Sequence, residues 1–130
     1  MSNAKIIRSK IHQRFLTLDK ELIQEIGLTE TVVMTEILDS IEVHNKNTVV
    51  INNEKWFVKS YDDWKKEFRI TNYTIKQVIK NLENLGLIET KLMKFEGVPT
   101  IHYKILWKKE VVKGVCKEIS KAYGYQKKYG

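Results

Sequence analysis

The sequence predicts an α+β domain, and three features lead to that prediction. The first is an amphipathic helix over residues 72–85. Its apolar residues recur at spacings of three and four, which is the pattern of one buried helical stripe: Ile75, Val78, Ile79, Leu82 and Leu85. The second is a shorter helix just before it, across the turn 69–71. The third is a pair of strand-like segments after it, at 87–95 and 100–107.

The part of the chain before this motif is predicted to be mainly helical. Residues 1–17 are basic and lack a clear period, so they are predicted to form an arm. A short helix spans 18–26 and is stopped by Gly27. A second helix begins at Thr29 and runs to about His44. Its inward stripe is predicted to consist of Val33, Met34, Ile37, Leu38 and Ile41.

An asparagine-rich break at 45–47 separates these helices from a predicted hairpin. Residues 48–51 and 56–59 are β-branched or aromatic segments that flank Asn52-Asn53. Ser60-Tyr61-Asp62-Asp63 then resembles a capping box, with aspartate in place of the preferred glutamate. This capping box is predicted to begin the shorter helix of the motif.

The two helices of the motif have recognisable ends. Tyr61, Trp64 and Phe68 share one face of the first helix, and Thr71 is placed to cap the second. Gly86 follows the last apolar position, where a left-handed residue is easily tolerated. Two helices across so short a turn predict a helix-turn-helix.

The segments after the motif predict a hairpin and a further helix. Glu96-Gly97-Val98-Pro99 has turn chemistry. Along 100–107, one face is predicted to carry Ile101, Tyr103, Ile105 and Trp107, and the other Thr100, His102 and Lys104. A helix-turn-helix followed by a hairpin is a winged helix. The predicted organisation is therefore an arm (1–17), a winged-helix domain (18–107), and a basic amphipathic helix with a tail (108–130).

The helix predicted at 108–123 has an apolar stripe of its own. It consists of Val111, Val112, Val115, Cys116, Ile119 and Tyr123. Because such a stripe needs cover, and the winged helix is already complete without it, we expect a homodimer or a higher oligomer.

Composition and charge suggest a partner that carries phosphates. The 130 residues fit one domain with appendages, and 42% hydrophobic residues are enough for a core. The net charge of +7 is unevenly spread, with basic ends around an acidic stretch at 21–60. This distribution favours a surface that binds phosphates, although a lysine-rich protein without such a role has the same composition.

Several classes of chemistry lack their residues. The six glycines are far apart, so no glycine-rich loop could hold a nucleotide. One cysteine and three scattered histidines give no metal-ligand spacing. Asp62-Asp63 is more typical of helix capping than of a catalytic carboxylate pair. We therefore expect a binding protein rather than an enzyme, with no cofactor and no metal.

The sequence also indicates a location in the cytoplasm. Cys116 is alone, so an intrachain disulfide is excluded and a reducing compartment is indicated. The N-terminus has no hydrophobic signal core, and no apolar run reaches the roughly 18 residues that span a bilayer.

The polar face of the 72–85 helix indicates what the protein could bind. It carries two lysines, two amides and one aromatic residue but no carboxylate: Tyr73, Lys76, Gln77, Lys80 and Asn84. A solvated face usually mixes both signs of charge, so this face favours nucleic acid. The three tryptophans, by contrast, lie in apolar patterns and are predicted to be core residues rather than base-stacking platforms: Trp56, Trp64 and Trp107.

The order of these motifs resembles a family of replication proteins. The matching pieces are EKWFVKS, DDWKKEFRITNYTIKQVIKNLENLGLIET and GVPTIHYKI. Over about residues 18–107 they resemble the N-terminal winged-helix domain of DnaD-type primosomal proteins, phage replisome organisers and plasmid replication initiator A proteins. One departure is Arg69, which stands where these relatives commonly carry glycine. It must adopt an unusual conformation there, or the turn must take another shape.

The resemblance implies a replication initiation factor that binds duplex DNA, with the 72–85 helix in a major groove and the hairpin beside it. The residue types agree with this. The residues predicted to approach base edges are Asn72, Tyr73, Thr74, Lys76 and Gln77. The residues predicted to bind phosphates are Lys80 on the helix, Arg69 in the turn, and Lys91, Lys94 and Lys104 on the wing. Because 20 lysines accompany three arginines, guanine reading should be modest.

Other readings of the same pattern remain open. Winged helices also occur in transcriptional regulators. In the replication family they also serve as protein–protein assembly modules, and the 29–44 and 108–123 helices could form such an interface. A role of the last helix at a membrane surface is a further option, because four of its lysines recur every four residues. A solvated or DNA-facing edge explains those lysines more simply.

Overall fold

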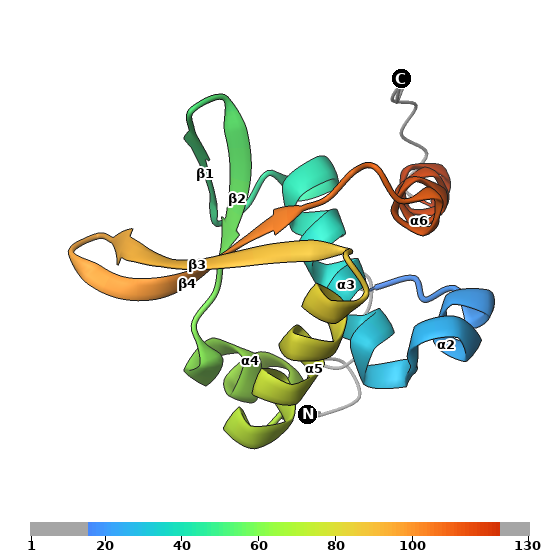
Figure 1. Ribbon diagram of the computed structural model, residues 1–130, viewed down its shortest axis with the longest axis horizontal. Helices are drawn as coiled ribbons and strands as arrows, with labels where there is room; N and C mark the ends of the chain where they lie inside the picture. The colour runs from blue at the N-terminus through green and yellow to red at the C-terminus, as the bar shows by residue number, and fades with distance from the viewer. Residues whose placement is uncertain (1–15, 123–130) are drawn as a thin grey trace, which may run out of the picture.

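The computed structural model describes residues 16–122, with side chains described as far as Lys117. Within that range the protein is an α+β fold with five α-helices and a four-stranded antiparallel sheet (Figure 1). The helical elements are α2 (Lys20–Ile26), α3 (Leu28–Asp39), the π-helical turn η1 (Ser40–His44), α4 (Tyr61–Phe68), α5 (Asn72–Asn84) and α6 (Glu110–Ala122). The strands are β1 (Thr48–Ile51), β2 (Glu54–Val58), β3 (Ile88–Phe95) and β4 (Val98–Ile105). Most of the predicted arm, and the tail from residue 123, lie outside the described residues.

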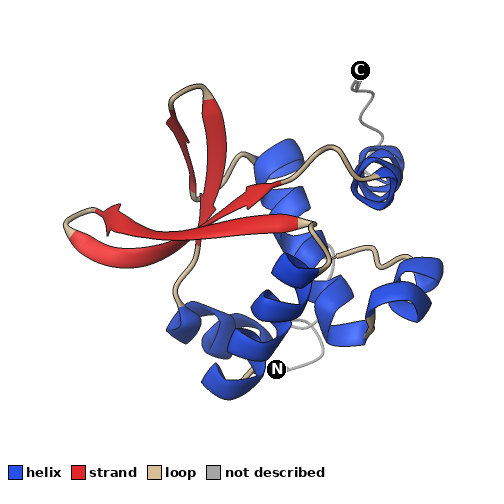
Figure 2. Cartoon of the chain, in the orientation of Figure 1, coloured by secondary structure: helices blue, strands red, loops and turns tan. Residues whose placement is uncertain are grey.

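The sheet consists of two hairpins that meet over a short junction. Its order is β1-β2-β4-β3. Strands β2 and β4 pair only through Phe57↔Tyr103 and Val58↔His102, so the hairpins diverge beyond this point (Figure 2). Asn52 and Asn53 join β1 to β2 with φ of 52° and 65°, as a two-residue hairpin turn with two left-handed residues requires. Both predicted hairpins are confirmed.

Helix α3 runs through the centre of the molecule. It packs against α2, α5, α6 and β4, and eight of its 12 residues are buried. The predicted stripe from Val33 to Ile41 is buried. The other side of the helix is also covered, because Thr31, Thr35 and Glu36 are each at most 1% exposed. The prediction of a single buried stripe therefore underestimated how much of α3 is buried.

Aromatic side chains join the sheet to α4. Trp64 Nε1–H donates a hydrogen bond to Tyr103 Oη at 3.0 Å, and the Tyr103 hydroxyl donates to the carbonyl of Lys59 at 3.1 Å. Burial raises the pKa of Tyr103 above its usual value of 10.0. Trp56 and Trp64 are buried, and Trp107 is half-buried against the core. The prediction that the tryptophans are core residues is confirmed.

The apolar stripe of α6 is covered by the chain itself. Val112, Val115 and Cys116 are buried, and α6 packs against α3 and η1. The side chains of Ile119 and Tyr123 lie outside the described part of the chain. The apolar stripe of α6, from which we expected an oligomer, is therefore covered within one protomer as far as Cys116.

From α2 to α6, no described helix is both long enough and apolar enough to cross a membrane.

Candidate nucleic-acid interface

The turn between α4 and α5 is fixed at both ends by hydrogen bonds. At the end of α4, the Arg69 N–H donates to the Lys65 carbonyl at 2.9 Å. Thr71 Oγ1 accepts the Thr74 N–H at 3.2 Å at the start of α5. Ile70 is buried between the two helices' ends. Arg69 ends α4 in the left-handed conformation, with φ 57° and ψ 33°. Of the two possibilities left open by the sequence, the chain therefore adopts the left-handed one.

Helix α5 separates into a buried and an exposed face, largely as predicted. Ile75, Val78, Ile79 and Leu82 are buried. Leu85, predicted to face the core, is instead 45% exposed because it is the C-terminal cap, and Leu87 is buried just beyond it. The exposed predicted residues are Asn72, Tyr73, Lys76, Gln77 and Lys80. Thr74 is half-buried, and its hydroxyl accepts a hydrogen bond from Thr71 at 3.0 Å.

The cations beside this face are not neutralised. Within residues 16–122, Arg69, Lys76 and Lys80 form no ion pair with a carboxylate. Lys76 Nζ lies 5.6 Å from the centre of the Tyr61 ring, a distance typical of a cation–π contact. The one acidic residue of α5, Glu83, accepts a hydrogen bond from Thr90 of β3 at 2.9 Å. A second carboxylate, that of Glu30, accepts a hydrogen bond from Asn81 of α5 at 2.8 Å. The exposed cations Lys76 and Lys80 are therefore free of salt bridges to described carboxylates, which favours contact with a polyanion.

The β3–β4 hairpin places its two exposed lysines on opposite faces. The bond from Thr90 to Glu83 shows which face of β3 lies toward α5. Because side chains alternate along a strand, Lys94 shares that face, whereas Lys91 points to the other side. Only Lys94 is therefore placed on the same side of the sheet as α5.

Lys104 lies apart from the other predicted contacts and is held by two carboxylates. Its Nζ is 2.9 Å from Glu54 Oε2 and 3.5 Å from Glu89 Oε1, and its side chain is 18% exposed. The hydrogen bond to Glu54 raises the pKa of Lys104, so the lysine stays charged. The neighbouring His102 is buried, with its ring 6.4 Å from that of Phe95. The structure therefore does not bring Lys104 together with the α5 cations.

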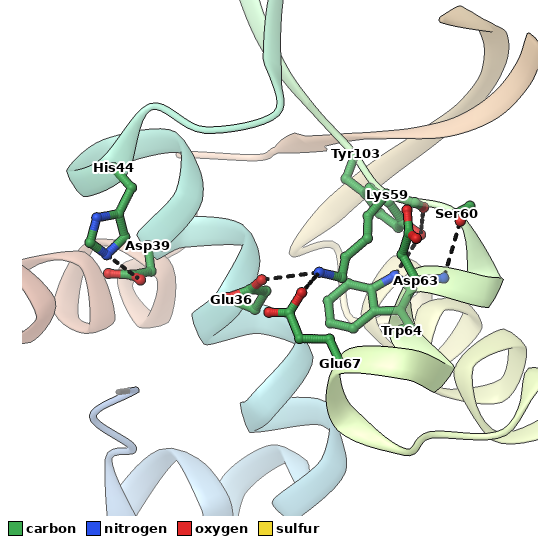
Figure 3. A network of polar contacts seen from close by, with 9 residues as sticks. All are labelled: Glu36, Asp39, His44, Lys59, Ser60, Asp63, Trp64, Glu67 and Tyr103. Atoms are coloured by element: carbon green, nitrogen blue, oxygen red, sulfur yellow. Dashed lines mark hydrogen bonds and ion pairs between the residues drawn. The ribbon is translucent and has the colours of Figure 1, made fainter. Parts of the chain in front are cut away.

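A buried ion cluster behind α4 was missed by the sequence reasoning (Figure 3). Lys59 is 4% exposed, and its Nζ lies 3.3 Å from Glu36 Oε2 and 2.5 Å from Glu67 Oε2. The same ammonium lies 5.1 Å from the centre of the Trp64 ring. The cluster links α3, the end of β2 and α4, so it helps to fix the helix that leads into the turn. The apolar run Trp56-Phe57-Val58 just before Lys59 was the one available signal.

The other polar features of the described chain include one histidine–aspartate pair and one surface pocket. No group of three or more metal-ligating side chains occurs between residues 16 and 122. His44 Nε2 lies 3.2 Å from Asp39 Oδ2 (Figure 3). A surface pocket of about 250 Å³ beside the turn of the β1–β2 hairpin is lined by two glutamates and two lysines, whose charges cancel.

Comparison with protein families, with curated proteins and with solved structures gives no match to this chain.

Proposed function

We propose that this protein is a winged-helix protein that binds double-stranded DNA through the exposed face of α5. One observation supports this most strongly. The exposed face carries lysines, amides and a tyrosine, and the one carboxylate of α5, that of Glu83, accepts a hydrogen bond from Thr90. Arg69, Lys76 and Lys80 have no ion-pair partner within the described chain.

The size and chemistry of α5 suit a major groove. At 13 residues it is roughly 20 Å long, and the major groove of B-DNA admits an α-helix. Asn72, Tyr73 and Gln77 lie in its first two turns, the part of a recognition helix that approaches base edges. Asparagine and glutamine pair with adenine through two hydrogen bonds. Tyr73 is 75% exposed and could reach a phosphate or a base edge.

The neighbouring elements support a winged-helix arrangement. Helix α4, a short turn and α5 are followed directly by the β3–β4 hairpin. Thr90 of that hairpin donates a hydrogen bond to Glu83 of α5. Lys94 lies on the same side of the sheet as α5. In the proposed complex, Lys94 binds a phosphate beside the groove that holds α5. Lys91, on the opposite face of β3, contacts a phosphate only if the DNA bends around the hairpin.

The resemblance to replisome organisers and plasmid initiators favours a role in replication initiation, in the cytoplasm of a bacterium or in its phage or plasmid. A winged-helix transcriptional regulator would use the same DNA contacts with other partners. An assembly module would leave the α5 face unused, and the unpaired cations on that face are evidence against this reading.

The proposal is tested by titrating the protein into labelled duplex DNA at several salt concentrations. If four to six phosphates are contacted per protomer, log K should fall against log salt with a slope of about −4 to −5. Binding that is undetectable at low salt, or that does not respond to salt, contradicts DNA binding and favours the assembly module.

A further inference from the structure

The two edges of the sheet differ in chemistry. Strand β3, at one edge, carries Glu89, Lys91 and Lys94. Strand β1, at the other edge, has the sequence TVVI, without charge or proline and paired to β2 without a bulge. Val50 is 66% exposed there. Proteins usually protect an exposed sheet edge with charges, proline or a bulge, so the unprotected β1 is suited to pairing with another strand.

The hairpin geometry decides which backbone groups face outward from β1. The turn at Asn52-Asn53 hydrogen-bonds Ile51 to Glu54, because these residues flank a two-residue loop. Hydrogen-bonded and non-hydrogen-bonded pairs then alternate along the ladder. Counting from Ile51 and Glu54, every second pair is hydrogen-bonded, and the pair Asn47–Val58 is one of these. The Val58 N–H does donate to the Asn47 carbonyl, at 2.8 Å. Thr48 and Val50 therefore direct their N–H and C=O groups away from β2.

The outer side of β1 is open in the described structure. The sheet order places only β2 beside it. Figure 1 shows the β1–β2 hairpin projecting away from the helices, with no described element along its outer edge.

We infer that β1 pairs antiparallel with β1 of a second copy of this chain, with the two-fold axis at Val49. In this register Thr48 of each copy lies opposite Val50 of the other. Because both residues direct their backbone groups outward, they exchange four hydrogen bonds across the dimer. The two Val49 residues face each other in a non-hydrogen-bonded pair, and the two four-stranded sheets become continuous.

A second copy fits this edge because the edge is self-complementary. A two-fold interface requires that each residue's partner on the other copy makes the reciprocal contact. The outward residues 48 and 50 are symmetric about 49, and no like charges meet when the strand faces itself. This dimer leaves α6 docked on its own α3, unlike the oligomer expected from the α6 stripe. It does not depend on DNA binding.

The first test replaces Val50 by lysine and measures self-association by sedimentation velocity over a range of concentrations. Val98→Lys is the matched control, since Val98 is a valine that is 61% exposed on the other hairpin. We expect Val50→Lys to weaken dimerisation by roughly tenfold or more, because the change occurs twice per dimer and places a charge at the edge. Val98→Lys should behave like the wild type. A strict monomer for the wild type, or equal effects of the two variants, overturns the inference.

The second test fixes the register with engineered cysteines under mild oxidation. In the inferred dimer the two residues at position 49 have Cα atoms about 4.5 Å apart, within reach of a disulfide. The two residues at position 50 are each opposite Thr48, so their Cα atoms are more than about 7 Å apart and cannot be bridged. Val49→Cys should therefore give a covalent dimer and Val50→Cys should not; the native Cys116 is buried. Cross-linking by Val50→Cys alone, or by neither variant, contradicts this register.

Discussion

Lys59 is a charged residue inside an otherwise aromatic part of the core. Its ammonium lies among the rings of Phe57, Trp64 and Phe68, at 5.1–6.0 Å from their centres. Rings at such distances attract a cation, but removing a charge from water costs several kcal/mol. The carboxylates of Glu36 and Glu67 offset that cost. The ammonium thereby holds α3 and α4 together.

Replacing Lys59 by methionine should strongly destabilise the protein. The Glu36 carboxylate would remain buried without the Lys59 ammonium, at a cost of about 3–5 kcal/mol in the free energy of unfolding. Urea denaturation measures this cost. Lys66→Met is the control, because its ion pair with Asp62 is exposed, and the unfolding free energy should hardly change. If adding Glu36→Gln to Lys59→Met recovers none of the loss, the ion cluster is not the cause.

Arg69 holds a backbone conformation that glycine adopts more easily. At φ 57° the left-handed region costs a residue with a Cβ roughly 1 kcal/mol or more. Glycine relieves this strain in the folded protein, but it also raises the backbone entropy of the unfolded chain, which opposes the stabilisation. Arg69→Gly should therefore raise the unfolding free energy by at most about 1 kcal/mol. If the guanidinium binds a phosphate, the same change should lower the salt slope of DNA binding by about one. A more stable variant with unchanged DNA binding would show that Arg69 makes no phosphate contact.

Within α5, the residues that read bases and those that bind phosphates should be separable. Asn72→Ala and Gln77→Ala remove amides that can pair with adenine. Each should cost about 1–3 kcal/mol of binding free energy on the preferred duplex and little on others. Affinities for a panel of duplexes measure this difference. Equal losses on all duplexes would contradict base reading by these two side chains.

The β3–β4 hairpin offers a test of its own, because Lys91 and Lys94 have the same charge but lie on opposite faces. Lys94→Ala should weaken DNA binding and lower the salt slope by about one, since Lys94 shares the face of β3 that lies toward α5. Lys91→Ala should have a smaller effect. A larger effect of Lys91→Ala would mean that DNA lies on the other side of the hairpin.

Periodicity in the sequence was enough to predict most elements of this fold. The helical spacing of Trp64 and Phe68 arises from local geometry that the sequence shows directly. The alternation predicted along β4 holds only in part, because His102, expected on the polar face, is buried. Contacts between distant segments were not predictable in this way. Lys104 meets Glu54 across 50 residues, and Lys59 meets Glu36 across 23. No spacing rule marks such pairs, so one predicted phosphate ligand proved to be held by carboxylates and one buried lysine was missed.

At the scale of the whole molecule, the basic charge does not by itself locate a binding surface. The net charge of +7 includes lysines on α5, on the β3–β4 hairpin and along α6. Helix α6 lies on the other side of α3 from the tip of that hairpin (Figure 1). A dimer formed through β1 would contain two α5 helices, so the number of DNA-binding faces per particle also depends on the dimer.

The central claim, that the exposed face of α5 binds the duplex, is tested most directly by comparing two charge-matched double variants. Lys76→Gln/Lys80→Gln removes two positive charges from α5, and Lys113→Gln/Lys117→Gln removes two from the exposed side of α6. The salt dependence of duplex binding is measured for both, after circular dichroism has confirmed that each variant is folded. We expect the α5 pair to lower the salt slope by about two and the α6 pair to leave it nearly unchanged. Equal slopes and equal affinities for the two variants would contradict the claim, because the duplex would then respond to net charge and not to α5.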